Sequence, residues 1–179
     1  MLINLLDPVI LLQLHRFKVQ EELKIKAKKQ IKILRDTEFY GTAYKGVAAW
    51  KGLVAEFICS DELSKVYDVQ LAASGIDFDT PHEYDMIVDN IKIDIKCATS
   101  NANWNICPNV HSVDNNSAQL YIGCRYISSS DGDFVEIHGA ITREEIMKCT
   151  KKSYYDPKKP FYEVPFHIMK PINKLKSNI

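Results

Sequence analysis

Two aspartates and a lysine stand close together in the chain and have the chemistry to hold a metal ion against a phosphate. Asp85 and Asp94 lie on either side of the polar pair Asp89-Asn90, and Lys96 follows Asp94 at the second position. Mg²⁺ usually takes one or two carboxylates from a protein, together with waters and substrate phosphate. A lysine beside such a pair can stabilise the negative charge that develops when a phosphodiester is attacked. These residue types favour metal-assisted hydrolysis of a phosphate ester.

Strand register is expected to bring the two aspartates together. With Asp89-Asn90 as a two-residue turn, counting outward pairs Val88 with Ile91, Met86 with Ile93, and Asp85 with Asp94. Alternation then puts Asp85, Asp94 and Lys96 on one face of the hairpin and its apolar residues on the other. Opposed residues have Cβ atoms about 5 Å apart, so two like charges there destabilise the sheet unless something offsets them. We expect a divalent cation to do so.

A purely structural interpretation of the hairpin stays open. In that interpretation the aspartates lie on a solvent-exposed face, where Lys96 or Lys92 neutralises them. The carboxylate-x-lysine pattern alone does not decide, because the chain has it three times, at Glu22-Leu23-Lys24, Asp94-Ile95-Lys96 and Asp156-Pro157-Lys158. Only the middle copy falls on a predicted strand with a second aspartate opposite.

Periodicity places this hairpin in a mixed α/β domain. We predict helices over residues 9–34, 44–59 and 142–151, the last opened by a capping box of Thr142 and Glu145. Strands are predicted over 66–71, 84–88, 91–98, 119–127 and 134–141, with a turn across 128–133. Residues 101–116 read as a loop, and the tail beyond 151 as extended or loop. This order predicts a central mixed sheet flanked by helices.

Length and composition fit a single domain. The 179 residues are enough for one core, and the 46% apolar and 26% charged fractions are those of a globular protein. We predict one domain over 1–179, with an N-terminal helical region at 1–40, a catalytic core at 44–141, and a C-terminal helix and extended tail at 142–179. Residues 1–14 are apolar but too few to cross a bilayer, so no membrane association is expected.

Charge is balanced overall but unevenly distributed. The net charge is zero, which argues against a strongly basic nucleic-acid binder. Residues 15–35, however, carry eight Lys or Arg against two Glu, and residues 56–94 carry ten carboxylates against two Lys. Basic flanks around an acidic centre suit a protein that holds a phosphate backbone near a metal. Solvated helix faces explain the same runs equally well.

Several other kinds of site are excluded by spacing. No two histidines stand at metal-ligand spacing, no glycine-rich loop leads into Lys-Ser or Lys-Thr, and the five cysteines form no CxxC pair. We therefore expect reduced thiols and a cytoplasmic protein. Four aromatic residues could stack on bases or pack at the core: Tyr40, Tyr44, Trp50 and Trp104.

These residues resemble the PD-(D/E)XK nuclease superfamily, the restriction-endonuclease-like proteins. The match consists of Glu56 on a predicted helix, Asp85 on a strand, the signature Asp94-Ile95-Lys96 on the next strand, and a following strand led by Gln119. It spans roughly residues 44–141. Tyr84 stands where the family often has proline, and the second acid is Asp where Glu is common.

The resemblance implies a Mg²⁺-dependent endonuclease acting on DNA, with Mn²⁺ able to substitute and a homodimer cutting both strands. A type II restriction-like role is the first interpretation, and a phage or repair junction nuclease is the alternative. The implied metal ligands are Asp85, Asp94, the main-chain carbonyl of Ile95 and Glu56, while Lys96 is placed at the nucleophile.

The outer acid, the role of Gln119 and the function each have alternatives that the sequence leaves open. Asp61, Glu62, Asp77 or Asp79 could replace Glu56 as the outer acid, and Gln119 either supports the site or only opens its strand. The competing functions are a nucleic-acid-binding module of the same fold without hydrolysis, and a protein-interaction domain.

Overall fold

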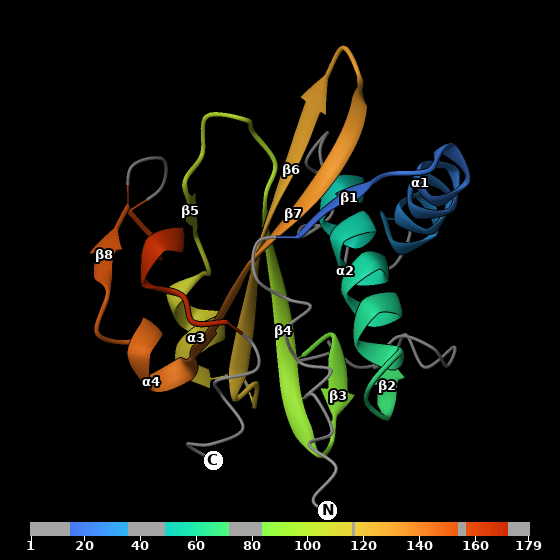
Figure 1. Ribbon diagram of the computed structural model, residues 1–179. Helices are drawn as coiled ribbons and strands as arrows, with labels where there is room; N and C mark the ends of the chain where they lie inside the picture. Colours follow the sequence, from blue (N-terminus) through green and yellow to red (C-terminus); the bar gives the residue numbers. More distant parts are fainter. Residues whose placement is uncertain (1–14, 36–48, 72–83, 116, 154–156, 172–179) are drawn as a thin grey trace, which may run out of the picture.

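A six-stranded mixed sheet runs through the centre of the molecule (Figure 1). The computed structural model describes residues 15–35, 49–71, 84–115, 117–153 and 157–171. The strands of the sheet are β1 (His15–Lys18), β2 (Val69–Leu71), β3 (Met86–Val88), β4 (Ile91–Ala98), β6 (Leu120–Ser129) and β7 (Gly132–Thr142). Their order is β1-β7-β6-β4-β3-β2, in which β4 and β6 are parallel and the other neighbours antiparallel.

Two helices cover one face of this sheet. Helix α2 (Ala49–Ser64) packs directly on the strands, and α1 (Glu21–Arg35) lies against α2 (Figure 1). In α1 a spacing of four puts Leu23, Ala27 and Ile31 on the side that faces the core. None of the described helices is long and apolar enough to span a membrane.

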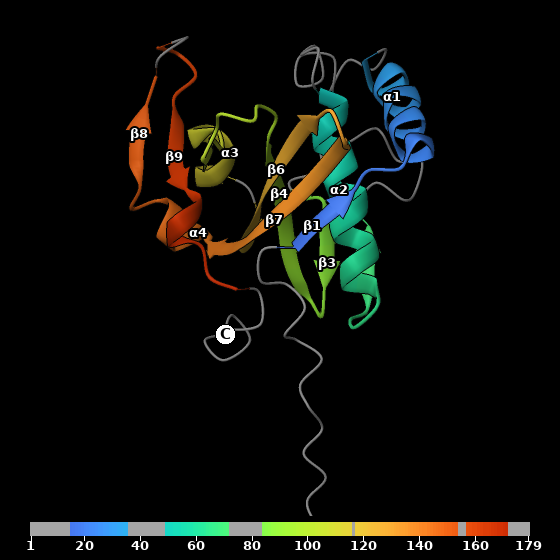
Figure 2. The same ribbon diagram turned by 45° about the horizontal axis from the view of Figure 1, so that its top comes forward.

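A second, smaller sheet covers the opposite face. It has the order β5-β9-β8, with β5 at Asn105–Ile106, β9 at Phe161–Pro165 and β8 at Thr150–Lys152. The short helices α3 (Val110–Asn115) and α4 (Arg143–Ile146) and the 3₁₀ turn η2 (Phe166–Ile168) complete this layer (Figure 2). Its core contains Tyr121, Ile141, Tyr162 and Val164. The mixed α/β class is confirmed: α1 and α2 cover one face of the central sheet, and the smaller sheet with its short helices covers the other.

The predicted hairpin turn is confirmed. Asp89 and Asn90 have φ of 48° and 68°, the left-handed conformations that a two-residue type I′ turn requires. Val88 pairs with Ile91 across it. The β6–β7 hairpin is tighter than predicted, because its strands extend until only residues 130 and 131 form the turn.

The N-terminal helix prediction was wrong at its start. Residues His15–Lys18 form β1, paired with β7, and α1 begins only at Glu21. Pairing with β7 and packing of Phe17 on the core outweigh the helix propensity of this segment. The second predicted helix ends later than predicted, because α2 continues to Ser64 instead of ending at 59; its predicted first residues lie outside the described ranges.

Three further differences lie in the C-terminal half. The segment 101–116 was predicted to be a loop but contains β5 and α3, and the capped helix ends at Ile146 instead of continuing to 151. Strand β8 takes up the last residues of that predicted helix, and the tail beyond 151, predicted to be extended or loop, contains β9. In β9 alternation buries Tyr162 and Val164, a period of two that the prolines on either side obscure in the sequence.

Two glycines let the C-terminal segment approach the central sheet. A Cβ at Gly123 would lie 2.3 Å from Met169 Sδ, and one at Gly139 would lie 2.6 Å from the Lys170 carbonyl oxygen. Gly139 also has φ +134°, beside a bulge in which β7 has one residue, His138, more than β6. Main-chain hydrogen bonds between Ala140 and Lys170 fix this approach.

Candidate functional site

The β3–β4 ladder stops one residue short of the two aspartates. Its register runs from Val88↔Ile91 to Met86↔Ile93, as predicted. Asp85 then departs from the predicted pairing with Asp94. Its amide donates to the Ile93 carbonyl (2.9 Å), and its Oδ2 accepts a hydrogen bond from the Ile95 amide (2.6 Å). The Asp85 carboxylate thus replaces a strand partner, because a short acidic side chain competes well for nearby main-chain N–H groups.

This departure ends the pairing of β4 with β3 beside Asp85. Within the described residues, no strand pairs with this edge of β4 beyond Ile93. A residue in a strand directs its N–H and C=O toward the same neighbour. Since the Ile95 amide points to Asp85, the Ile95 carbonyl faces the same edge. The implied main-chain ligand and the Asp85 carboxylate therefore share one side of β4.

Asp94 and Lys96 form an ion pair on β4. Lys96 Nζ lies 2.8 Å from Asp94 Oδ1, and the exposed fractions of the two side chains are 32% and 5%. Both alternate with Ile93 and Ile95, whose side chains pack in the core beneath α2, so they face the other layer. The interpretation that places both aspartates on a solvent-exposed face is wrong for Asp94, because Asp94 is buried. It is right that Lys96 neutralises this aspartate.

Glu56 joins the group from helix α2. Burial raises the pKa of Glu56 to about 7; the Lys96 charge opposes this rise and the Asp94 charge adds to it. Burial, followed by repulsion from Glu56 and from Asp94, holds the pKa of Asp85 well above its usual range, although Lys96 and the Ile95 amide act against it. The Asp94 charge acts on both Glu56 and Asp85, and the Glu56 charge acts on Asp85, so the three carboxylates share one electrostatic environment.

Lys96 is the counter-charge within this group. Burial lowers the pKa of the Lys96 ammonium, but Asp94 and Asp85 outweigh burial, and the pKa is raised. Lys96 is therefore a cation at neutral pH. If all three acids were ionised, they would outnumber the one ammonium where water solvates charge poorly; the raised pKa values of Glu56 and Asp85 oppose that ionisation, and a further cation would favour it. We refer to Glu56, Asp85, Asp94 and Lys96 as the acidic site.

The donor types of the acidic site suit Mg²⁺, although its side chains are not arranged around an ion. In the described part of the chain, no three His, Cys, Asp or Glu side chains are grouped to hold a metal. Asp94 binds Lys96, and Asp85 binds the Ile95 amide. The carboxylates and the Ile95 carbonyl are hard oxygen ligands, the kind that Mg²⁺ prefers. Binding would require Asp94 to exchange Lys96 for the metal.

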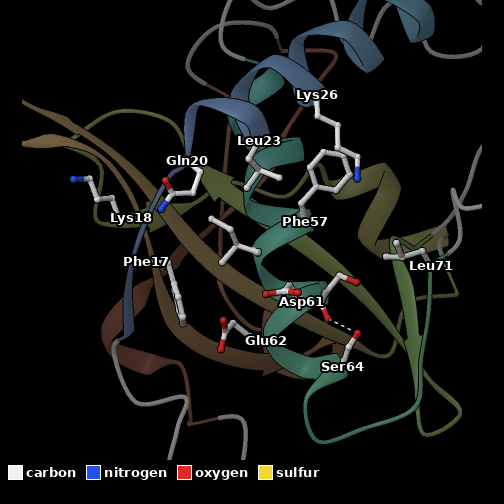
Figure 3. A pocket seen from close by; sticks show the side chains of 12 residues that line it. Phe17, Lys18, Gln20, Leu23, Lys26, Phe57, Asp61, Glu62, Ser64 and Leu71 are labelled. Atoms are coloured by element: carbon white, nitrogen blue, oxygen red, sulfur yellow. Dashed lines mark hydrogen bonds between the residues drawn. The ribbon is translucent and has the colours of Figure 1, made fainter.

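The alternative outer acids lie elsewhere. Asp61 and Glu62 pair with Lys65 and line a separate pocket between β1, α1 and α2 (Figure 3). Phe17 and Phe57 contribute apolar walls to that pocket, and no residue of the acidic site lines it. The other two alternatives, at positions 77 and 79, fall outside the described residues.

Gln119 has a structural role. Its side-chain Oε1 accepts a hydrogen bond from the Lys92 amide (3.1 Å), and its own amide donates to the Lys92 carbonyl (2.9 Å). These bonds align the starts of β4 and β6. Lys92 precedes Lys96 by four residues, about 13 Å along the strand. Gln119 therefore opens its strand, as the simpler interpretation held, and lies away from the acidic site.

Sequence reasoning missed a second charged cluster on the same sheet face. Arg125 Nη2 and Nε donate to Glu136 Oε2 at 2.7 and 3.2 Å, and both side chains are about nine-tenths buried. The His138 ring stacks on Phe166 with centroids 3.9 Å apart, and burial lowers the pKa of His138 despite the nearby Glu136 carboxylate. The available signal was two charged residues at inward positions of otherwise apolar strands.

Comparison with family models, with curated proteins and with solved structures finds no match to this chain. The site must therefore be interpreted from its own residues.

Proposed function

We propose that this chain is a Mg²⁺-dependent endonuclease that hydrolyses DNA phosphodiester bonds at the acidic site. The observation that carries the proposal is the concentration of three carboxylates and one lysine beside β4, at the point where its pairing with β3 ends. The carboxylates repel one another and are poorly solvated, an arrangement that disfavours the ionised state unless a cation is bound. The likeness to PD-(D/E)XK nucleases in residue types and order supports the same function.

Each residue has a role that follows from its position. Asp85, Asp94 and the Ile95 carbonyl would hold Mg²⁺, with Glu56 as an additional acidic ligand. The bound ion would polarise the phosphodiester and acidify the attacking water. Lys96, released from Asp94 but still charged, is placed to bind a non-bridging phosphate oxygen and stabilise its developing charge. A duplex cut in both strands needs two such sites, so the proposal includes a homodimer.

Nicking of a supercoiled plasmid in Mg²⁺ tests the assignment. We expect Asp94→Ala and Lys96→Ala each to lower the nicking rate at least about 100-fold, the usual cost of losing one group that stabilises the transition state. The matched controls are Asp61→Ala and Lys92→Ala, an exposed acid on α2 and a lysine on the same strand. Circular dichroism checks folding. Wild-type nicking rates in both folded site variants would refute the proposal.

A non-catalytic nucleic-acid-binding module is the competing function. The Asp94–Lys96 ion pair favours it, because lysine satisfies this carboxylate without a metal. Calorimetric titration with Mn²⁺ separates the two. The nuclease proposal expects a site in the wild type that Asp85→Ala abolishes, whereas a binding module would retain DNA and show no Mn²⁺ site.

A further inference from the structure

Trp104 is presented to solvent from a fixed segment of backbone. Its residue exposure is 62%, and its carbonyl accepts a hydrogen bond from the Phe166 amide (3.0 Å) at the start of the second sheet. Upstream, the Asn101 side chain donates to the Ser128 carbonyl (2.8 Å) and accepts from the Ser128 amide (3.0 Å). The connection from β4 to β5 is therefore tied to β6, and the exposed indole is held in place.

A buried arginine backs one face of the indole. The Arg125 guanidinium carbon lies 3.9 Å from the centre of the Trp104 ring. Arg125 is itself held by its two hydrogen bonds to Glu136. The indole thus stacks on a rigid, charge-paired support on one side, while the high exposure of the residue leaves aromatic surface open to a ligand.

This platform lies beside the acidic site on the same face of the sheet. In the parallel ladder Lys96 pairs with Gly123, and Ala98 with Arg125. Lys96 and Arg125 are thus separated by two residues along the strands and one strand across. Standard strand dimensions put their Cα atoms about 8 Å apart. A nucleic acid with a phosphate at Lys96 would carry its neighbouring nucleotides close to Trp104.

We infer that Trp104, backed by Arg125, stacks on an unpaired base of the nucleic acid that the acidic site cleaves. The inference rests on the proposed nuclease function and narrows its substrate to DNA with a single-stranded or unstacked nucleotide near the cut. Bases within an intact duplex are already stacked on both sides, so an indole can stack only on a base that is unpaired or unstacked. Trp50 does not serve this purpose, because it is half-buried and packs edge-on against Tyr126.

Binding without cleavage tests the platform. The full chain in EDTA is titrated into fluorescein-labelled (dT)₁₅ and into a 15-base-pair duplex, and anisotropy is measured. We expect Trp104→Ala to weaken (dT)₁₅ binding about 5- to 150-fold, the range found when one stacked base loses its aromatic partner. Trp104→Phe should keep most of the affinity. The control is Met147→Ala, which removes another exposed apolar side chain.

Fluorescence gives a second measurement. In a Trp50→Phe background Trp104 is the remaining tryptophan, and (dT)₁₅ should quench its emission. The inference is overturned if Trp104→Ala binds (dT)₁₅ as tightly as the wild type, or if the substitution weakens duplex binding as much as (dT)₁₅ binding. It is also overturned if the wild type does not bind (dT)₁₅, or if (dT)₁₅ does not quench the Trp104 emission. Any of these results together with Mg²⁺-dependent nicking would leave the nuclease proposal intact. If (dT)₁₅ binding depends on Trp104 but the protein does not nick the plasmid in Mg²⁺, the nuclease proposal is refuted.

Discussion

Replacing Glu56 by glutamine should stabilise the metal-free protein at alkaline pH and have little effect at acid pH. The folded protein holds the Glu56 proton more tightly than the unfolded chain does, because the pKa is raised from 4.5 to about 7 on folding. Protonation of Glu56 therefore favours folding. This contribution is fully present below about pH 4.5 and is lost as the pH rises through about 7. Glutamine is neutral throughout and avoids the loss.

The size of the effect follows from the pKa. Each tenfold change in proton affinity is worth about 1.4 kcal/mol, so the rise from 4.5 to about 7 corresponds to at most about 3 kcal/mol at pH 8. Glu56 keeps some contact with solvent, which reduces the cost of its charge and makes this an upper value. For a chain of this length 3 kcal/mol corresponds to a melting temperature about 6–12 °C higher.

Urea unfolding at pH 4.5 and pH 8 in EDTA measures the difference. The control is Asp61→Asn, which removes an exposed acid from the same helix and should show no such pH dependence. Mg²⁺ should reduce the difference in the free energy of unfolding between wild type and Glu56→Gln at pH 8, since a bound cation offsets the charge of the ionised Glu56. If Glu56→Gln is no more stable than wild type at pH 8, the electrostatic description of the acidic site is wrong.

Two further stability predictions concern backbone geometry and capping. Gly139→Ala should lower the free energy of unfolding by at least about 1–3 kcal/mol, because φ of +134° strains any side chain and its Cβ would meet the Lys170 carbonyl. Gly52→Ala, in open space within α2, should instead raise the free energy of unfolding by about 0.5–1 kcal/mol. Equal urea midpoints for the two variants would contradict this prediction. Thr142→Ala should lower the free energy of unfolding, measured in urea, by about 1 kcal/mol, because Thr142 Oγ1 accepts a hydrogen bond from the Glu145 amide in the capping box. An unchanged urea midpoint would show that the cap does not contribute to stability.

Local patterns predicted the hairpin and its faces. Asp89-Asn90 is a turn that its own residue types favour, and alternation correctly put Ile93 and Ile95 in the core. The extent of β4 was predicted to the residue. The capping box of α4 was equally local and is confirmed. These features depend on residues that lie close together in the sequence, so the sequence alone is enough to predict them.

What could not be predicted depends on distant contacts. Register alone implied that Asp85 faces Asp94, but the Asp85 carboxylate binds the Ile95 amide and ends the ladder. The sheet opposite α2 includes β9, whose alternation is hidden in the sequence by the prolines on either side, so this layer could not be predicted. Sequence reasoning likewise treated Trp104 as one of four aromatic residues, since its support by Arg125 arises only when the connection from β4 to β5 lies against β6.

The strand that carries Asp94 and Lys96 is shared by both hydrophobic cores. Ile93 and Ile95 pack beneath α2, whereas Ala98 packs against the second sheet. Neither half of the molecule can come apart without exposing β4, so the two layers should unfold in a single cooperative transition. A fragment that lacks either layer would lose one side of this strand, and with it the burial that gives the acids their unusual proton affinity.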